Sequence, residues 1–510
     1  MDELNTINGI GVNAGFKKSI YFLFSVIVFA YLLFRAIIMD MTYDEIWTLN
    51  QFVPSSFYHI INYTPCVANN HILNTVLIKI LFLTGSQHYF LARLPNLLAS
   101  IVFLFFTYRI ANIFLSSVTG FVFFILLVTN PYLLDFFSLA RGYGLALGFQ
   151  MASLYYLISF IYNHQTKSAY YSLLVGSLAV LSNFAWLNYF IVLLPLILCA
   201  GWLLADIKYR IRFISVAGFI SLALAAIVYE PLRKLKNSEE LWYGGGSDFF
   251  SDSLISLAHY TLYLEVSYSA THWVLISFLT VTITITVLSF YFNREIISAR
   301  TGLVLLLIFS TLSAITQHFL LGTLYPIDRS TLLYYPLFIS VLCFSWEDIS
   351  THFRYHRLFL ILALISTINF IKNASTFKCA NWYHDSRTSE ILEWLNNKGI
   401  QEHRQIKIDY SWPVSGSTEY LLNKNRFPFV KSVKNQIQRD SLNYETDFYI
   451  YFAEPILKVG YDANSQRINH VLKDTVLKFE KEKLYVFSNI RGSNPLSKIL
   501  ETKTRRRENF

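Results

Sequence analysis

The sequence predicts an α-helical polytopic membrane protein with a small α/β soluble domain at its C-terminal end. The chain of 510 residues is 54% hydrophobic and only 15% charged, which is unusual for a soluble globular protein. Apolar runs long enough to cross a bilayer of about 30 Å recur from about residue 18 to residue 371. They lack the alternating pattern of a membrane β-barrel, so helices are expected to span. After residue 371 the composition becomes that of a soluble domain.

The first expected span covers about 19–38 and follows Lys17 and Lys18, so the positive-inside rule places the N-terminus in the cytoplasm. Further spans, which bring the total to about eleven, are expected at about 90–108, 112–130, 143–162, 169–185, 187–204, 213–229, 271–292, 301–320, 331–346 and 357–371. Every connection on the expected cytoplasmic side carries a Lys or Arg. An odd number of spans exports the C-terminus. The net charge of +9 does not indicate nucleic-acid binding, because the basic residues are dispersed at span ends.

Two domains follow from this pattern. A membrane domain is expected over residues 1–375, with outer loops at 40–89 and 230–270, and an extracytoplasmic α/β domain over 376–510, with a basic disordered tail. Short interfacial helices are expected at 54–61 and 71–83 in the first loop. In the second loop the glycines at 244–246 form either a mobile substrate cover or a surface turn, and the turn is favoured.

The C-terminal domain is expected to begin with a helix over 386–399. Asp385 and Ser386 are the expected caps of this helix, and Gly399 is its expected stop. Strand-like runs follow at 404–410, 447–452 and 483–489.

Adjacent acids, Asp44 and Glu45, follow the first span by a few residues. Ionisable groups at a membrane surface are usually functional, and a carboxylate there can remove a proton from an acceptor hydroxyl. Asp44 is the first choice for this base, although an Asp before a helix is also a common cap. Glu45 could share the role, orient a cation, or be solvated. The division of labour between them stays open.

Three arginines stand at the expected outer mouths of spans: Arg93, Arg141 and Arg329. The planar guanidinium makes two parallel charge-assisted hydrogen bonds to phosphate, so these residues are expected to hold a lipid phosphate and stabilise it as a leaving group. Snorkelling to the headgroups is the simpler explanation for any one of them. Three of them opposite an acidic loop make snorkelling less adequate.

Four further residues are candidates for substrate binding: His71, Asn70, Tyr143 and Asp328. One histidine without partners at ligand spacing does not indicate zinc, so no metal site is expected, although a divalent cation is possible. A structural or substrate-contacting histidine is the favoured interpretation of His71. Tyr143 is expected to line a sugar site, with an aromatic belt as the alternative.

The motifs YDEIWT, NNHILNTVL, ARLPNLLAS, ARGYGLALGF and YPIDRSTLLYYP occur in this order within roughly 17–371. In order and placement they resemble those of the GT-C membrane glycosyltransferases. The group includes protein O-mannosyltransferases, the aminoarabinose transferase of lipid A and Rgt-type bacterial transferases. Where that family often has His-Pro, this sequence has His71 followed by Ile72.

The resemblance implies an integral membrane glycosyltransferase, a hexosyl- or pentosyltransferase, in a bacterial inner membrane. It would move a sugar from a polyprenyl-phosphate donor to a glycolipid, polysaccharide or protein acceptor on the extracytoplasmic face. By the same resemblance, an acid of the first outer loop, here Asp44, is the base, and the arginines meet the donor phosphate. One displacement would invert the anomeric centre. The alternative is a transporter or flippase of a lipid-linked saccharide, but the inverted repeats typical of transporters are not evident.

Overall fold

The computed structural model describes residues 14–86, 88–204, 210–263, 266–354, 356–433, 446–452, 475–480 and 483–488. The chain divides into two compact units. The first, here called the helical unit, comprises residues 1–38 and 48–376; the second, the C-terminal unit, comprises 377–510 and also 39–47. A nine-residue segment of the first outer loop therefore belongs with the C-terminal unit.

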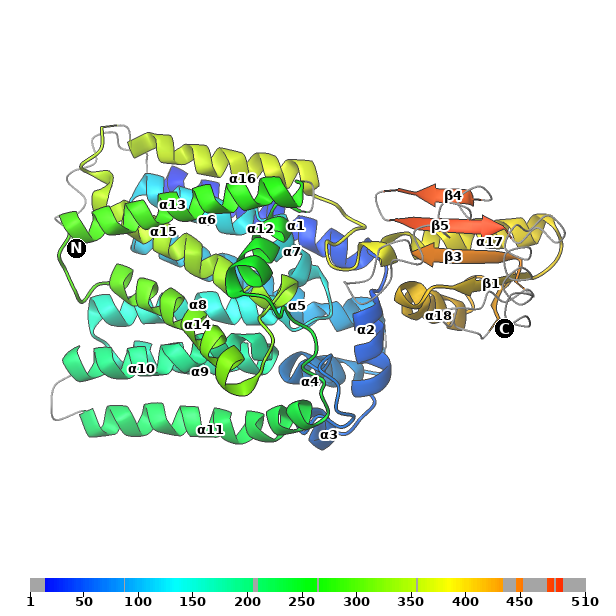
Figure 1. Cartoon of the computed structure of the whole chain (residues 1–510), viewed down its shortest axis with the longest axis horizontal. Helices are drawn as coiled ribbons and strands as arrows, with labels where there is room; N and C mark the ends of the chain where they lie inside the picture. The colour runs from blue at the N-terminus through cyan, green and yellow to red at the C-terminus, as the bar shows by residue number, and fades with distance from the viewer. Residues whose placement is uncertain are drawn as a thin grey trace, which may run out of the picture. The chain divides into compact units, whose positions relative to one another are not determined.

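Within the described residues, eight helical segments of the helical unit are long and apolar enough to cross a membrane (Figure 1). They lie in α1 (Ala14–Ile38), α5 (Tyr89–Ile113), α8 (Tyr143–Asn163), η4 with α10 (Phe184–Trp186, Leu187–Leu204), α11 (Arg210–Asn237), α13 (Tyr268–Phe292), α14 (Ala299–Leu321) and η7 with α15 (Asp328–Thr331, Tyr334–Ser350). The pair α6 (Ser117–Val128) and α7 with η3 (Pro131–Asp135, Phe136–Ser138) is bent by 52° and makes a ninth when it is counted as one broken span. The predicted fold class is confirmed.

In the described part of the chain, the eight or nine candidate spans are fewer than the eleven expected. Two of the predicted spans form α9 (Thr166–Ser182) and α16 (Leu360–Asn373), which have 17 and 14 residues. At 1.5 Å per residue these helices rise about 26 and 21 Å, less than the apolar thickness of a bilayer. The break between α6 and α7 falls at Asn130, which caps α7, and at Pro131, which begins it.

Short helices occupy the outer loops. The two expected in the first loop are present as α3 (Phe57–Ile61) and α4 (Ile72–Phe82), preceded by η2 (Thr48–Phe52). The second loop contains η6 (Phe249–Leu254) and α12 (Ile255–Thr261). Gly245 pairs with Tyr325 through two backbone hydrogen bonds of 2.9 and 2.8 Å. The glycine run is therefore anchored to the segment before Asp328.

The C-terminal unit is an α/β sandwich built on five strands in the order β2-β1-β3-β5-β4. The strands are β1 (Ile406–Tyr410), β2 (Val430–Ser432), β3 (Phe448–Phe452), β4 (Thr475–Phe479) and β5 (Leu484–Ser488). β1 is parallel to β2 and β3, and β5 is antiparallel to β3 and β4. The three expected strands are β1, β3 and β5. The expected basic tail lies outside the described residues.

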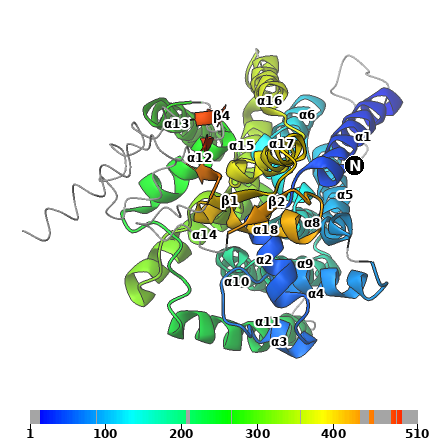
Figure 2. The same ribbon diagram turned by 90° about the vertical axis from the view of Figure 1, so that its right-hand side faces the viewer.

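Two helices accompany this sheet, α17 (Thr388–Gln401) and α18 (Ser415–Asn423), together with the short α2 (Tyr43–Trp47), which lies beside α18 (Figure 2). α17 passes its expected stop, because Gly399 is needed for close packing instead. A Cβ on this residue would lie 2.7 Å from the Cβ of Phe429. The expected caps, Asp385 and Ser386, were also wrong, because Arg387 is the N-cap of α17. Asp385 instead accepts the N–H of Tyr43 at the start of α2.

Candidate active site

Arg141, one of the three predicted arginines, is held by hydrogen bonds in the interior of the helical unit. It stands two residues before α8 and is 2% exposed. Its guanidinium donates to Oγ1 of Thr48 at 3.1 Å and to the carbonyl of Asn69 at 3.0 Å. An arginine held by two such bonds in the protein interior is not snorkelling to headgroups, so its charge stays at the start of a candidate span.

A chain of buried asparagines fixes the backbone on both sides of Arg141. Asn74 donates to the carbonyl of Ala140 at 3.1 Å. Asn96 donates to Asn74 at 2.7 Å and accepts the N–H of Leu145 at 3.0 Å. Sequence reasoning missed this function, although both asparagines lie within the quoted motifs NNHILNTVL and ARLPNLLAS. Asparagines inside apolar helices were the available signal.

The glycines of ARGYGLALGF explain why α8 can pack so closely. A Cβ at Gly142 would lie 1.9 Å from the carbonyl oxygen of Ser182, and one at Gly144 would lie 2.6 Å from that of Phe136. Only glycine fits at these approaches. The candidate span in α8 is 83% buried, against 22% for those in α11 and α13, so the helix that presents Arg141 forms the centre of the helical unit.

His71 lies at the N-terminus of α4, outside the candidate spans, and is 6% exposed. Its Nδ1 lies 3.4 Å from Nδ2 of Asn183, whose Oδ1 is fixed by the N–H of Ala185 at 2.9 Å. An amide nitrogen can only donate, so Nδ1 accepts and the proton of the neutral ring lies on Nε2. Nε2 is buried and has no hydrogen-bond partner.

The electrostatic surroundings of His71 are positive. Burial lowers the pKa of this imidazole well below its usual value, and the charges of Arg141 and Arg329 lower it further. The ring of Tyr143 packs edge-on against it at 5.2 Å between centroids. The structure therefore groups His71, Tyr143, Arg141 and Arg329, four of the predicted residues. A buried N–H donor that is influenced by two guanidinium charges is suited to an anion.

Arg329 and its neighbour Asp328 are held by the second outer loop. The Asp328 carboxylate accepts from the hydroxyls of Tyr243 at 2.6 Å and Ser256 at 2.7 Å. The Arg329 guanidinium lies 4.5 Å from the centroid of the Tyr243 ring. Both residues lie in η7, where the start of a helical segment favours negative charge. Asp328 has a positioning function here, which sequence reasoning did not assign.

Two other predicted residues make structural contacts. Asn70 donates to the carbonyl of Ile60 at 2.8 Å and accepts from the hydroxyl of Thr75 at 2.9 Å, which ties α3 to α4. Arg93 is fully buried and donates to the carbonyl of Ala36 at 3.2 Å, near the end of α1. The structure thus places Arg93 on a carbonyl in the last turn of α1, a favourable site for a cation.

A buried ion pair was not foreseen. Arg35 lies 2.7 Å from Asp135, with both side chains at most 2% exposed. Tyr263 donates to both oxygens of this carboxylate at 3.1 Å, and Arg35 also donates to the carbonyl of Ser375 at 2.7 Å. The signal was a charged residue within an apolar run, at Arg35 and again at Asp135.

In the C-terminal unit, described by itself, the predicted acids lie on α2. Thr42 and Glu45 form a capping box: the N–H of Thr42 donates to Oε2 of Glu45 at 2.9 Å, and the N–H of Glu45 lies 3.4 Å from Oγ1 of Thr42. Glu45 is fully buried, so it is not solvated. The T-x-x-E spacing of Thr42 and Glu45 is the sequence signal for this capping box. Asp44 is half-buried.

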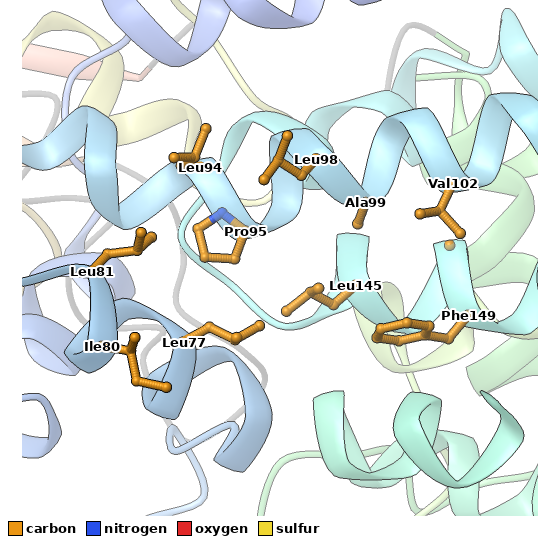
Figure 3. Close-up of a pocket in the computed structure, with 11 residues that line it drawn as sticks. Leu77, Ile80, Leu81, Leu94, Pro95, Leu98, Ala99, Val102, Leu145 and Phe149 are labelled. Carbon is orange, nitrogen blue, oxygen red and sulfur yellow. The ribbon is translucent and has the colours of Figure 1, made fainter. Parts of the chain in front are cut away.

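An apolar cavity of about 300 Å³ lies between α4, α5 and α8 of the helical unit (Figure 3). Its walls include Leu77 and Leu81 of α4, Leu94 of α5, and Leu145 and Phe149 of α8. α4 therefore carries His71 at its N-terminus and lines an apolar cavity two turns later.

Among the residues that the structure describes, no group of three His, Cys, Asp or Glu side chains is arranged to hold a metal ion. The cation considered beside Glu45 therefore has no ligand set in the described part of the chain.

The fold and this site define a polytopic helical membrane protein with a buried cationic site beside an apolar cavity. No family model matches the chain, and no curated protein matches it significantly. Among solved structures the chain is similar to the crystal structure of ArnT from Cupriavidus metallidurans bound to undecaprenyl phosphate. The identity is 9% and the TM-score 0.45, over 92% of this chain and 98% of that one.

It is also similar to the crystal structure of the Archaeoglobus fulgidus oligosaccharyltransferase in complex with zinc and sulfate. The identity is 12% and the TM-score 0.38, over 81% of this chain and 62% of that one. At TM-scores below 0.5 neither likeness assigns an activity to this chain.

Proposed function

We propose that this chain is a membrane glycosyltransferase that takes a sugar from a polyprenyl-phosphate donor and transfers it to an acceptor hydroxyl on the extracytoplasmic face. The observation that carries the proposal is the buried His71, whose Nε2–H lacks a partner and whose surroundings are made positive by Arg141 and Arg329. The resemblance of the motifs to GT-C transferases supports the reaction type.

The donor phosphate is assigned to the cationic site. Arg141 and Arg329 supply permanent charge, and the neutral His71 supplies one N–H donor. Both arginines stand at the start of helical segments, where the helix dipole adds to the attraction for an anion. The apolar cavity beside α4 accepts the first isoprene units of the lipid, because its walls are almost entirely apolar side chains.

The reaction is a single displacement. The acceptor oxygen attacks the anomeric carbon, the bond from that carbon to the phosphate oxygen breaks, and the electron pair leaves with the phosphate. The proton of the acceptor hydroxyl passes to Asp44, and the anomeric centre inverts. Asp44 is proposed as the base in preference to Glu45, because the Glu45 carboxylate is buried and accepts hydrogen bonds from Thr42. Arg93 stays a weaker candidate for donor binding.

The test measures binding of undecaprenyl phosphate and of undecaprenol to the purified full chain. Arg141→Gln and Arg329→Gln should each weaken binding of the phosphate about tenfold, because a charge-assisted hydrogen bond is worth about 1.5–3 kcal/mol. Undecaprenol binding should not change. Arg109→Gln is the control, since Arg109 lies near the C-terminal end of α5 and donates to the hydroxyl of Tyr155. Equal loss for both lipids, or no loss, would contradict the phosphate assignment.

A second experiment tests the reaction. Cells lacking this chain are complemented with wild type or Asp44→Asn at matched membrane levels, and surface glycans are compared by mass spectrometry. If one sugar is missing from the surface glycans and only wild type restores it, the result supports the transferase. The rate of sugar transfer is expected to fall by a factor of about 10²–10⁴ when the base is missing. Lipid movement across sealed vesicles without sugar transfer would instead support the transporter.

A further inference from the structure

The segment 39–47 is the feature from which this inference starts. It follows α1 directly in sequence, yet it belongs to the C-terminal unit, whose other residues begin at Phe377. It contains α2, a helix of only five residues. So short a helix is not stable by itself, because nucleation of the first turn is unfavourable. The conformation of α2 must therefore come from its surroundings.

Two aspartates link this segment to the region where α17 begins, and each one accepts a backbone N–H of the other segment. Asp385 accepts the N–H of Tyr43, the first residue of α2, at 2.8 Å. In return Asp40 accepts from the N–H of Ser389 at 3.1 Å and from its hydroxyl at 2.6 Å. Each side chain thus satisfies a backbone donor in the first turn of the other segment's helix.

α18 supplies the third restraint on α2. The hydroxyl of Ser417 donates to Asp385 at 2.8 Å, so the cap itself is held in place. A Cβ at Gly416 would lie 2.6 Å from Cδ2 of Tyr43, so the α18 backbone packs directly on the first residue of α2. Figure 2 shows α2 and α18 side by side.

We propose that the C-terminal unit positions the catalytic acid: Asp385, Asp40 and Gly416 fix α2 and thereby the carboxylate of Asp44. The inference rests on the proposed function, in which Asp44 is the base. Asp385 and Asp40 are positioning residues, since they act on the helix that carries Asp44. A general base must be held within hydrogen-bond reach of the proton it removes, and an error of 1 Å costs about 100-fold in rate.

The pKa of Asp385 shows that this side chain senses the charges of the segment 39–47. Burial raises the pKa of Asp385 to about 8, and the negative charges of Asp44 and Asp40 raise it further, while the N–H of Tyr43 and the hydroxyl of Ser417 oppose the shift. His384 is a further titratable group beside Asp385, with its Nε2 3.7 Å from the carboxyl group. The charge of Asp44 is therefore felt at the cap that holds its helix.

The experiment compares Asp385→Ala, which removes the cap, with Asp385→Asn, which keeps an acceptor for the Tyr43 N–H. Asp447→Asn is the matched control, because Asp447 also accepts a backbone N–H in this unit, that of Lys407 at 2.8 Å. Hydrogen–deuterium exchange of the full chain is measured over residues 40–49, together with undecaprenyl phosphate binding and restoration of the missing glycan.

Asp385→Ala should speed exchange in residues 40–49 at least tenfold and reduce glycan restoration at least tenfold, with binding of undecaprenyl phosphate unchanged. Asp385→Asn and Asp447→Asn should stay within twofold of wild type in all three. Unchanged exchange in Asp385→Ala would overturn the capping, and faster exchange with full restoration would overturn the positioning. Equal loss of lipid binding would show a general structural effect and would also overturn it. Full restoration by Asp44→Asn would instead refute the proposed base, whatever the exchange shows.

Discussion

At the scale of single residues, the most informative group is His71. Its pKa is lowered by burial and by two arginine charges, so the free protein holds it neutral near pH 7. A bound phosphate would supply negative charge beside the ring and raise that pKa. Binding would then be linked to proton uptake, and affinity would increase as the pH falls.

We therefore expect the affinity for undecaprenyl phosphate to be nearly constant above pH 7 and to increase as the pH falls through the pKa of His71 in the complex. His71→Gln should remove this component and leave only the titration of the phosphate itself. The measurement is a series of binding isotherms from pH 5.5 to 8 for both proteins. Identical pH dependence in both would contradict the contact between His71 and the phosphate.

Asp385 gives a second prediction, about stability. Burial raises the pKa of this carboxyl group from its usual 3.8 to about 8 in the folded protein. Between these two pH values Asp385 is protonated in the folded protein and ionised in the unfolded chain. The free energy of unfolding should therefore fall as the pH rises from about 4 to 8. The decrease is at most about 1.4 kcal/mol per pH unit. Asp385→Asn should flatten this part of the profile, as measured by unfolding of the full chain in detergent.

The control for this profile is Asp447→Asn, which should leave it unchanged. A steep decline that survives in Asp385→Asn would show that another group controls the pH dependence.

At the scale of secondary-structure elements, α8 depends on its glycines and α11 does not. A Cβ at Gly142 would lie 1.9 Å from the carbonyl of Ser182 and 3.0 Å from the Cβ of His71, whereas Gly218 of α11 has nothing within 4 Å. Gly142→Ala should destabilise the protein by about 1–3 kcal/mol and weaken binding of undecaprenyl phosphate. Gly218→Ala should be neutral or stabilising by up to about 1 kcal/mol.

Thermal unfolding in detergent, with lipid binding at 20 °C below the transition, separates these outcomes. A stable Gly142→Ala protein with normal binding would mean that α8 can shift without disturbing His71.

The elements also show what local patterns can predict. The strands β1, β3 and β5 and the helices α3 and α4 were expected from apolar periodicity, which depends only on near neighbours. The ends of α9 and α16 were not, because an apolar run continues beyond the helix that it contains. The capping box of α2 was readable from the spacing of Thr42 and Glu45.

At the scale of the whole molecule, topology gives the last prediction. The expected eleven spans and the nine found when the bent pair is counted are both odd, whereas eight is even. With the N-terminus in the cytoplasm, an odd count exports the C-terminal unit. Alkaline phosphatase fused after residue 376 should be active, and a fluorescent protein that folds only in the cytoplasm should stay dark at the same position. The reverse result would place both termini on one side and remove α6 with α7 as a span.

The sequence by itself determined the membrane class, the α/β character of the C-terminal unit and the residue types suited to phosphate, because composition and periodicity record burial in lipid or water residue by residue. Only the tertiary structure decided that the charges of Arg141 and Arg329 lower the pKa of His71, while Arg93 donates to a carbonyl near the end of α1. Likewise, only the tertiary structure joined α2 to the C-terminal unit, through a bond between Tyr43 and Asp385 that spans 342 residues. Such contacts follow from long-range packing, which no local pattern encodes.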